Sequence, residues 1–92
     1  MYAALITLTI DPDRAPAAAA ALTDEILPTL RSAPGFLAGY WLDPGSDGHG
    51  FSMVVFEAED QVRRSVPPMG NWDAPGVTID AVEFRRVAVS LT

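Results

Sequence analysis

This 92-residue chain contains no cysteine, no lysine and a single histidine. Without cysteine it can form no disulfide bond, and it offers neither a thiolate nucleophile nor a sulfur ligand for a metal. No apolar run approaches the roughly 18–20 residues that are needed to span a bilayer. The first residues also lack the basic segment of a signal peptide. We therefore expect a cytoplasmic protein that has no membrane partner.

Basic residues are also scarce, with six against twelve acidic residues, so the net charge is −6. The resulting field repels phosphate backbones and anionic lipid headgroups, which argues against generic binding to nucleic acids or membrane surfaces. Small molecules or other proteins are the better partners. All basic residues are arginine and alanine is frequent, a composition typical of a GC-rich bacterial genome.

The first half of the chain shows a strand, a helix and a β-hairpin. Residues 2–10 are apolar at every even position, which predicts a strand. Residues 13–33 carry an apolar stripe at helical spacing, and Pro28 is expected to kink the last turns. The composition of residues 36–42 and 51–56 predicts two strands, which are joined by turn-forming residues. The helical stripe consists of Ala15, Ala19, Leu22, Ile26 and Leu30.

The second half adds one helix and one long strand. Residues 58–66 predict a short helix that ends at Pro67 and Pro68. Residues 77–91 are extended, and their apolar positions change parity around Ala81 and Val82, which predicts a bulge or bend. The order is thus βαββαβ, and we expect residues 1–92 to form a single domain.

This element order predicts an α+β, ferredoxin-like fold, with a four-stranded antiparallel sheet and two helices on one face. Residues 2–10 and 51–56 are too apolar on both faces for one face to stay in water. A chain of this size also buries only about 60–65% of its unfolded surface, so self-association would help it. We therefore expect a homodimer in which a second copy covers the free face of the sheet.

Several segments resemble the antibiotic biosynthesis monooxygenase-like proteins of the dimeric α+β barrel superfamily. The resemblance begins at the helix-to-strand junction of residues 27–36, with its Pro34-Gly35 stop. It continues through residues 39–41 and 54–57 and into the last strand at residues 76–79. It implies a ferredoxin-like subunit whose sheet packs against that of a partner, and an oxygenase that acts on aromatic substrates, often without a bound metal or flavin.

The haem-degrading branch of that superfamily has an asparagine on the first strand, a tryptophan on the second helix and an axial histidine just beyond. Here the only asparagine is Asn71, the second helix has no tryptophan, and the only histidine, His49, falls in the predicted hairpin turn. We therefore expect no haem degradation by that mechanism and no bound cofactor.

His49 and the arginine pair of the last strand are the candidates for catalysis. Histidine is the residue type whose ordinary pKa lies near neutrality, so His49, the only histidine, is a candidate proton acceptor, although a histidine between glycines at a hairpin tip also fits a solvated turn residue. Arg85 and Arg86 point to opposite faces of the last strand. Either could bind the carboxylate or phenolate of a ligand. Alternatively, either could form a structural ion pair with Glu83 or Asp80.

Aromatic residues and one amide are the candidates for ligand binding. Asn71 and Trp72 lie in an irregular segment, where they could stack on and hydrogen-bond a planar ligand. Trp72 could equally plug the open end of the core. Tyr40 and Trp41 are adjacent in a strand, so only one of them can line a given cavity, and we expect Tyr40 to shape the pocket.

No metal site is expected. Asp43, Asp47 and Gly48 match part of the spacing of a calcium-binding loop. The third position is Gly45, however, and Val54 stands where the bidentate glutamate is required, so the pattern fails.

Two hypotheses for function remain. The first is a cofactor-independent monooxygenase that acts on a small aromatic substrate, with Trp72 and Tyr40 shaping the pocket and His49 or Arg86 stabilising a deprotonated substrate. The second is a non-catalytic, ligand-binding or accessory homodimer with the same fold. A cavity with polar groups converging on an apolar wall would favour the enzyme, and a filled core would favour the accessory role.

Overall fold

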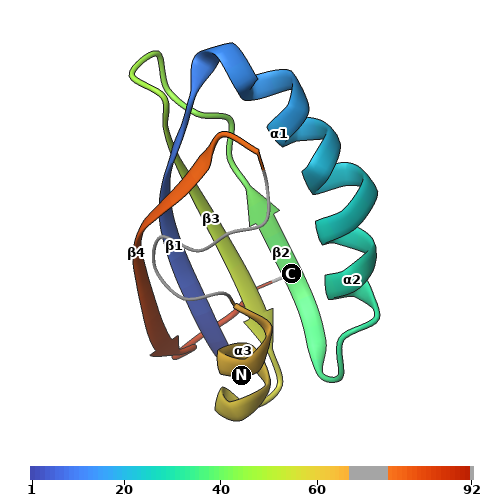
Figure 1. Ribbon diagram of the computed structural model, residues 1–92. Coiled ribbons are helices and arrows are strands. Elements are labelled where there is room, and N and C mark those ends of the chain that lie inside the picture. The colour runs from blue at the N-terminus through green and yellow to red at the C-terminus, as the bar shows by residue number, and fades with distance from the viewer. Residues whose placement is uncertain (67–74, 92) are drawn as a thin grey trace.

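The computed structural model describes residues 1–66 and 75–91 of the chain (Figure 1). Its regular elements include a 3₁₀ turn, η1, and a π-helical segment, η2. In chain order they are β1 (Tyr2–Ile10), η1 (Pro12–Arg14), α1 (Ala15–Ala21), η2 (Leu22–Ile26), α2 (Leu27–Arg31), β2 (Phe36–Trp41), β3 (His49–Phe56), α3 (Glu59–Ser65) and β4 (Val77–Arg86).

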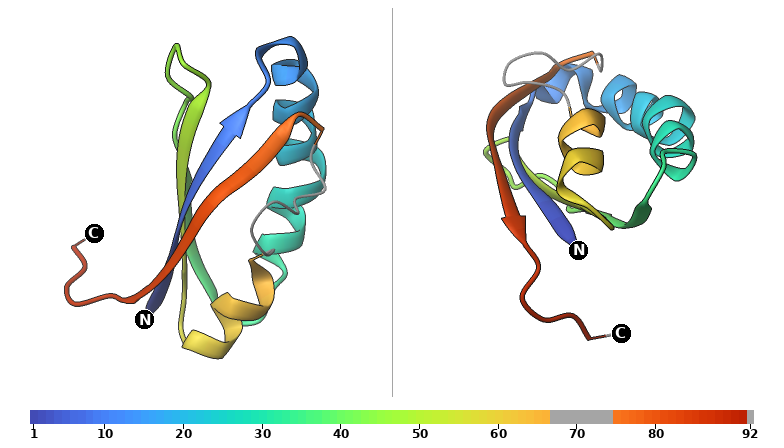
Figure 2. Two further views of the ribbon diagram at one scale, coloured as in Figure 1. Left: turned by 60° about the vertical axis from the view of Figure 1, so that its left-hand side comes forward. Right: turned by 90° about the horizontal axis from the view of Figure 1, so that it is seen from below.

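The four strands form one antiparallel sheet in the order β2-β3-β1-β4. The long helical rod made by α1, η2 and α2 and the short helix α3 lie on the same side of this sheet (Figure 2). This arrangement confirms the predicted α+β, ferredoxin-like fold with a four-stranded antiparallel sheet and two helices on one face.

The core lies between the sheet and the helices because the alternation of β1 and β3 sends one set of side chains toward the helical layer. Ala4 and Ile6 of β1 and Val54 and Phe56 of β3 are almost completely buried there. The rings of Phe56 and Phe36 also meet edge to face, with centroids 5.5 Å apart. The helices contribute Leu30, Val62 and Val66 to the same cluster.

Pro28 is accommodated by a widened turn in the helical rod. The turn before it is π-helical, and the amide of Leu27 donates to the carbonyl of Leu22, five residues back. Pro28 has no amide hydrogen, and its ring crowds the carbonyl of Asp24, so the wider turn gives that carbonyl room. The helix therefore continues through Pro28 and ends beyond Arg31.

β4 contains the predicted irregularity, one residue before the expected position. Thr7 pairs with Ala81 and Leu8 with Ile79, so Asp80 is the extra residue of a bulge. A second irregularity at Leu37 shifts the register between β2 and β3.

The sheet face turned away from the helices, here called the open face, carries large apolar side chains. Leu5, Met53 and Tyr40 are neighbours across three strands, and their exposed fractions are 42%, 37% and 55%. Phe51 and Leu42 are also exposed, one row further along. After β4 the chain leaves the sheet on this same side (Figure 2).

None of the helices in the described part of the chain is both long enough and apolar enough to cross a membrane.

Candidate ligand-binding cavity

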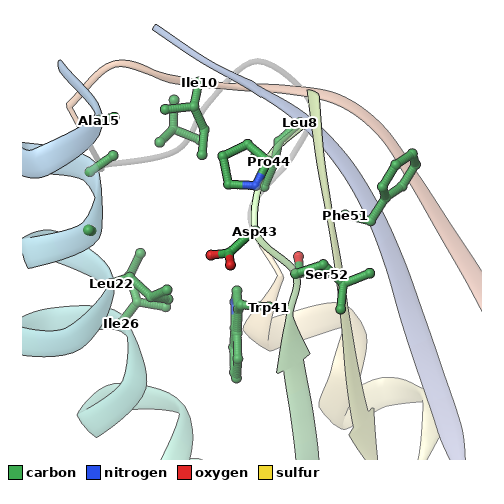
Figure 3. Close-up of a pocket in the computed structure, with 14 residues that line it drawn as sticks. Leu8, Ile10, Ala15, Leu22, Ile26, Trp41, Asp43, Pro44, Phe51 and Ser52 are labelled. Atoms are coloured by element: carbon green, nitrogen blue, oxygen red, sulfur yellow. The ribbon is translucent and has the colours of Figure 1, made fainter. Parts of the chain in front are cut away.

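A cavity of about 280 Å³ lies between the helical rod and the sheet, where β2 ends and β3 begins (Figure 3). Its lining comes from β1, the helical rod, the β2–β3 hairpin and the start of β4. The lining residues are Leu8, Ile10, Ala15, Ala18, Ala19, Leu22, Ile26, Trp41, Leu42, Asp43, Pro44, Phe51, Ser52 and Val77.

The cavity exists because the helical wall is built from alanine. Ala15, Ala18 and Ala19 face the sheet with single methyl groups, which leave space that larger side chains would fill. One turn further along, Leu22 and Ile26 close the wall opposite the indole of Trp41 (Figure 3). The apolar stripe predicted from the sequence therefore lines a cavity over most of its length.

Two polar atoms are buried at this site. Trp41 and Ser52 are direct partners in the β2–β3 ladder and share the face turned toward the helices. Neither Trp41 Nε1 nor Ser52 Oγ has a hydrogen-bond partner among the described residues, and Ser52 is only 2% exposed. An unsatisfied buried group costs roughly 1–3 kcal/mol, so such groups often mark a place where a ligand or water completes the bonding.

Asp43 adds one charge to the lining. It lies two residues after the end of β2, and its carboxylate points into the cavity toward the helical wall (Figure 3). No other lining residue in the described part of the chain is ionisable. The site thus combines apolar walls and an exposed carboxylate acceptor with a hydroxyl and an indole N–H that are buried in the wall.

Tyr40 does not reach this cavity. It lies on the open face opposite Met53, whereas Trp41, its neighbour in sequence, turns toward the helices. Ligand binding by Tyr40 therefore stays a prediction that concerns the other face of the sheet. The two remaining predicted ligand-binding residues, Asn71 and Trp72, lie outside the described residues.

His49 is the first residue of β3, so its predicted place in the hairpin turn is wrong. The reason is a long-range pairing, because His49 lies opposite Thr9 of β1. Its Nδ1 is 3.2 Å from Thr9 Oγ1, and that hydroxyl donates to Asp80 Oδ2 at 2.5 Å. Since the single proton of Thr9 goes to the carboxylate, Nδ1–H of His49 donates to Thr9. His49 is therefore part of a chain of hydrogen bonds across three strands and does not line the cavity.

The arginines of β4 are also separate from the cavity. Arg85 Nη2 lies 3.2 Å from Glu83 Oε1. This ion pair confirms the structural role, one of the two alternatives predicted for the arginines. Both side chains are exposed, so the pair contributes little to stability. Arg86 lies opposite Tyr2, at the end of β1 that is remote from the cavity residues Leu8 and Ile10.

Sequence reasoning did not single out Ser52 or Asp43 as site residues. A signal for Ser52 was present, because it is the one hydroxyl on the buried side of β3, between Gly50 and Val54. Asp43 could be recognised only as a turn former, since nothing local shows where its side chain points.

Comparison of the chain with models of known protein families finds no match, and neither does comparison with curated proteins.

Proposed function

We propose that this protein binds a small, largely apolar and planar molecule in the cavity between the helical rod and the sheet. The observation that carries the proposal is the cavity itself, whose lining is apolar apart from the carboxylate of Asp43 and the two buried, unpartnered polar atoms Trp41 Nε1 and Ser52 Oγ. Ligand sites typically combine hydrophobic walls with a few polar groups that set the orientation of the ligand.

The size of the cavity supports a ligand of one or two rings. An apolar cavity of about 150 Å³ accommodates benzene, and the cavity here measures about 280 Å³. The flat indole of Trp41 forms one wall, against which a planar ring can stack.

We propose further that the protein acts as a homodimer in the bacterial cytoplasm. The second copy covers the open face, because Leu5, Met53, Tyr40 and Phe51 expose a continuous apolar surface that one chain alone leaves in water. Most of the cavity lining lies on the helical side of the sheet, and only Leu42 and Phe51 belong to the open face as well, so each subunit keeps its own binding site.

The alternative function is that of a cofactor-independent monooxygenase for a small aromatic substrate. The resemblance to antibiotic biosynthesis monooxygenase-like proteins supports it. The structural observation in its favour is Asp43, a carboxylate in the cavity that can accept a proton from a bound substrate. Oxygen uptake by the protein with a hydroxylated naphthalene would support this alternative, and binding without oxygen uptake would favour the non-catalytic role.

The binding proposal is tested by filling the cavity. Ala18 is buried in the lining, and Ala20 lies exposed on the same helix outside it. Ala18→Leu is expected to weaken calorimetric binding of naphthylmethanol at least tenfold, because the added side chain takes up the ligand's space. Ala20→Leu serves as the matched control and keeps the affinity. No saturable binding to the unmodified protein at millimolar ligand would contradict the proposal.

A further inference from the structure

The charge in the lining of the cavity is negative. Among the residues that the structure describes, Asp43 is the only ionisable one in the lining. The cationic side chains of the whole chain are six arginines and His49, and none of them belongs to the lining. Arg14 is adjacent to the lining residue Ala15 and its aliphatic carbons lie against Gly76, but it does not belong to the lining itself. A bound anion would therefore meet a carboxylate and no counter-ion.

Asp43 is placed to receive a cation. Its carboxylate points into the cavity, beside the indole of Trp41 (Figure 3). A carboxylate accepts charge-assisted hydrogen bonds from an ammonium group, and the face of an indole also attracts cations. The net charge of −6 adds a field that attracts cations to the protein as a whole.

We infer that the ligand of this cavity is an amine, with an ammonium group that pairs with Asp43 and an apolar body of one or two rings packed against Leu22, Ile26 and Trp41. This inference rests on the proposed binding function of the same cavity and adds the chemical class of its ligand. It argues against a deprotonated phenol as the ligand. His49 and Arg86, the two cationic residues considered for stabilising such an anion, lie outside the cavity lining.

Three ligands with the same ring system test the inference. Naphthylmethylamine is cationic at neutral pH, naphthylmethanol is neutral, and naphthoic acid is anionic. Calorimetric titration of the full chain at low salt is expected to show the amine binding about fivefold tighter than the alcohol, the factor that an exposed ion pair can supply. The acid should bind most weakly. Added salt should reduce the preference for the amine, since it screens exposed charges.

The variant Asp43→Asn tests whether Asp43 causes the preference for the amine over the alcohol. This variant should bind amine and alcohol with equal affinity, because the negative charge that distinguishes the two ligands is gone. Glu57→Gln is the matched control, because Glu57 is an exposed carboxylate that follows the far end of β3 and lies outside the lining. It removes the same charge and should keep the preference for the amine.

The outcomes separate this inference from the proposed function. If the alcohol binds and the acid binds as tightly as the amine, or if Asp43→Asn keeps the preference, the inference is overturned and the binding function stands. If none of the three ligands binds, the proposed function fails, and the inference fails with it.

Discussion

Trp41 and Ser52 lie directly opposite each other on neighbouring strands, and each buries a polar atom that no described residue satisfies. Elsewhere in the described core, the buried side chains are apolar. This pair therefore departs from the rule that buried polar groups are hydrogen-bonded. The two unsatisfied groups lie at the cavity. We expect this where selection has favoured ligand binding over maximal stability.

The first prediction concerns the hydroxyl of Ser52. Ser52→Ala should raise the free energy of unfolding of the ligand-free protein by about 1 kcal/mol, because it removes an unsatisfied buried group. Urea denaturation measures this change. Ser65→Ala is the control, since Ser65 Oγ donates to the carbonyl of Gln61 and its loss should not stabilise the protein. A clear loss of stability in Ser52→Ala would show that the hydroxyl is satisfied after all.

The second prediction concerns the open face. Met53→Glu should convert the proposed dimer into a monomer, because it places a charge between Leu5 and Tyr40 on the open face, outside the cavity lining. Light scattering coupled to size exclusion gives the mass. Thr23→Glu, at an exposed position of the helical rod, should leave the dimer intact. A monomeric unmodified protein at micromolar concentration would refute the dimer outright.

The third prediction separates His49 from the cavity. His49→Ala should leave the affinity for naphthylmethanol unchanged within twofold, because the side chain bonds to Thr9 and does not line the cavity. The free energy of unfolding should change by less than about 1 kcal/mol, as expected for an exposed hydrogen bond. A tenfold loss of affinity would connect the chain of His49, Thr9 and Asp80 with ligand binding.

Much of the fold follows from local patterns in the sequence. The alternation of β1 separates Ala4 and Ile6, which are buried, from Leu5, which is exposed. The Pro34-Gly35 stop ends the first helix, and Gly35 adopts a φ of 81°, which glycine tolerates far better than other residues. The parity change in the last strand correctly indicated the bulge at Asp80.

The cavity could not be predicted from the sequence, because it depends on features that no local pattern shows. Phe36 and Trp41 are five positions apart, so a regular strand would turn them to opposite faces. The bulge at Leu37 lets both pack against the same core cluster, and this decides that Trp41, in place of Tyr40, lines the cavity. Likewise, the space itself arises only when the alanines of α1 come to lie opposite Ser52.

The most direct test of the account is the nuclear magnetic resonance signal of the Trp41 indole N–H during titration with naphthylmethylamine, assigned with the Trp41→Phe variant. We predict that this signal shifts saturably, together with the backbone amides of Ser52 and Asp43, because the ligand enters the cavity that these residues line. Saturable shifts confined to Leu5, Met53 and Tyr40 on the open face, with the Trp41 signal unmoved, would contradict the account.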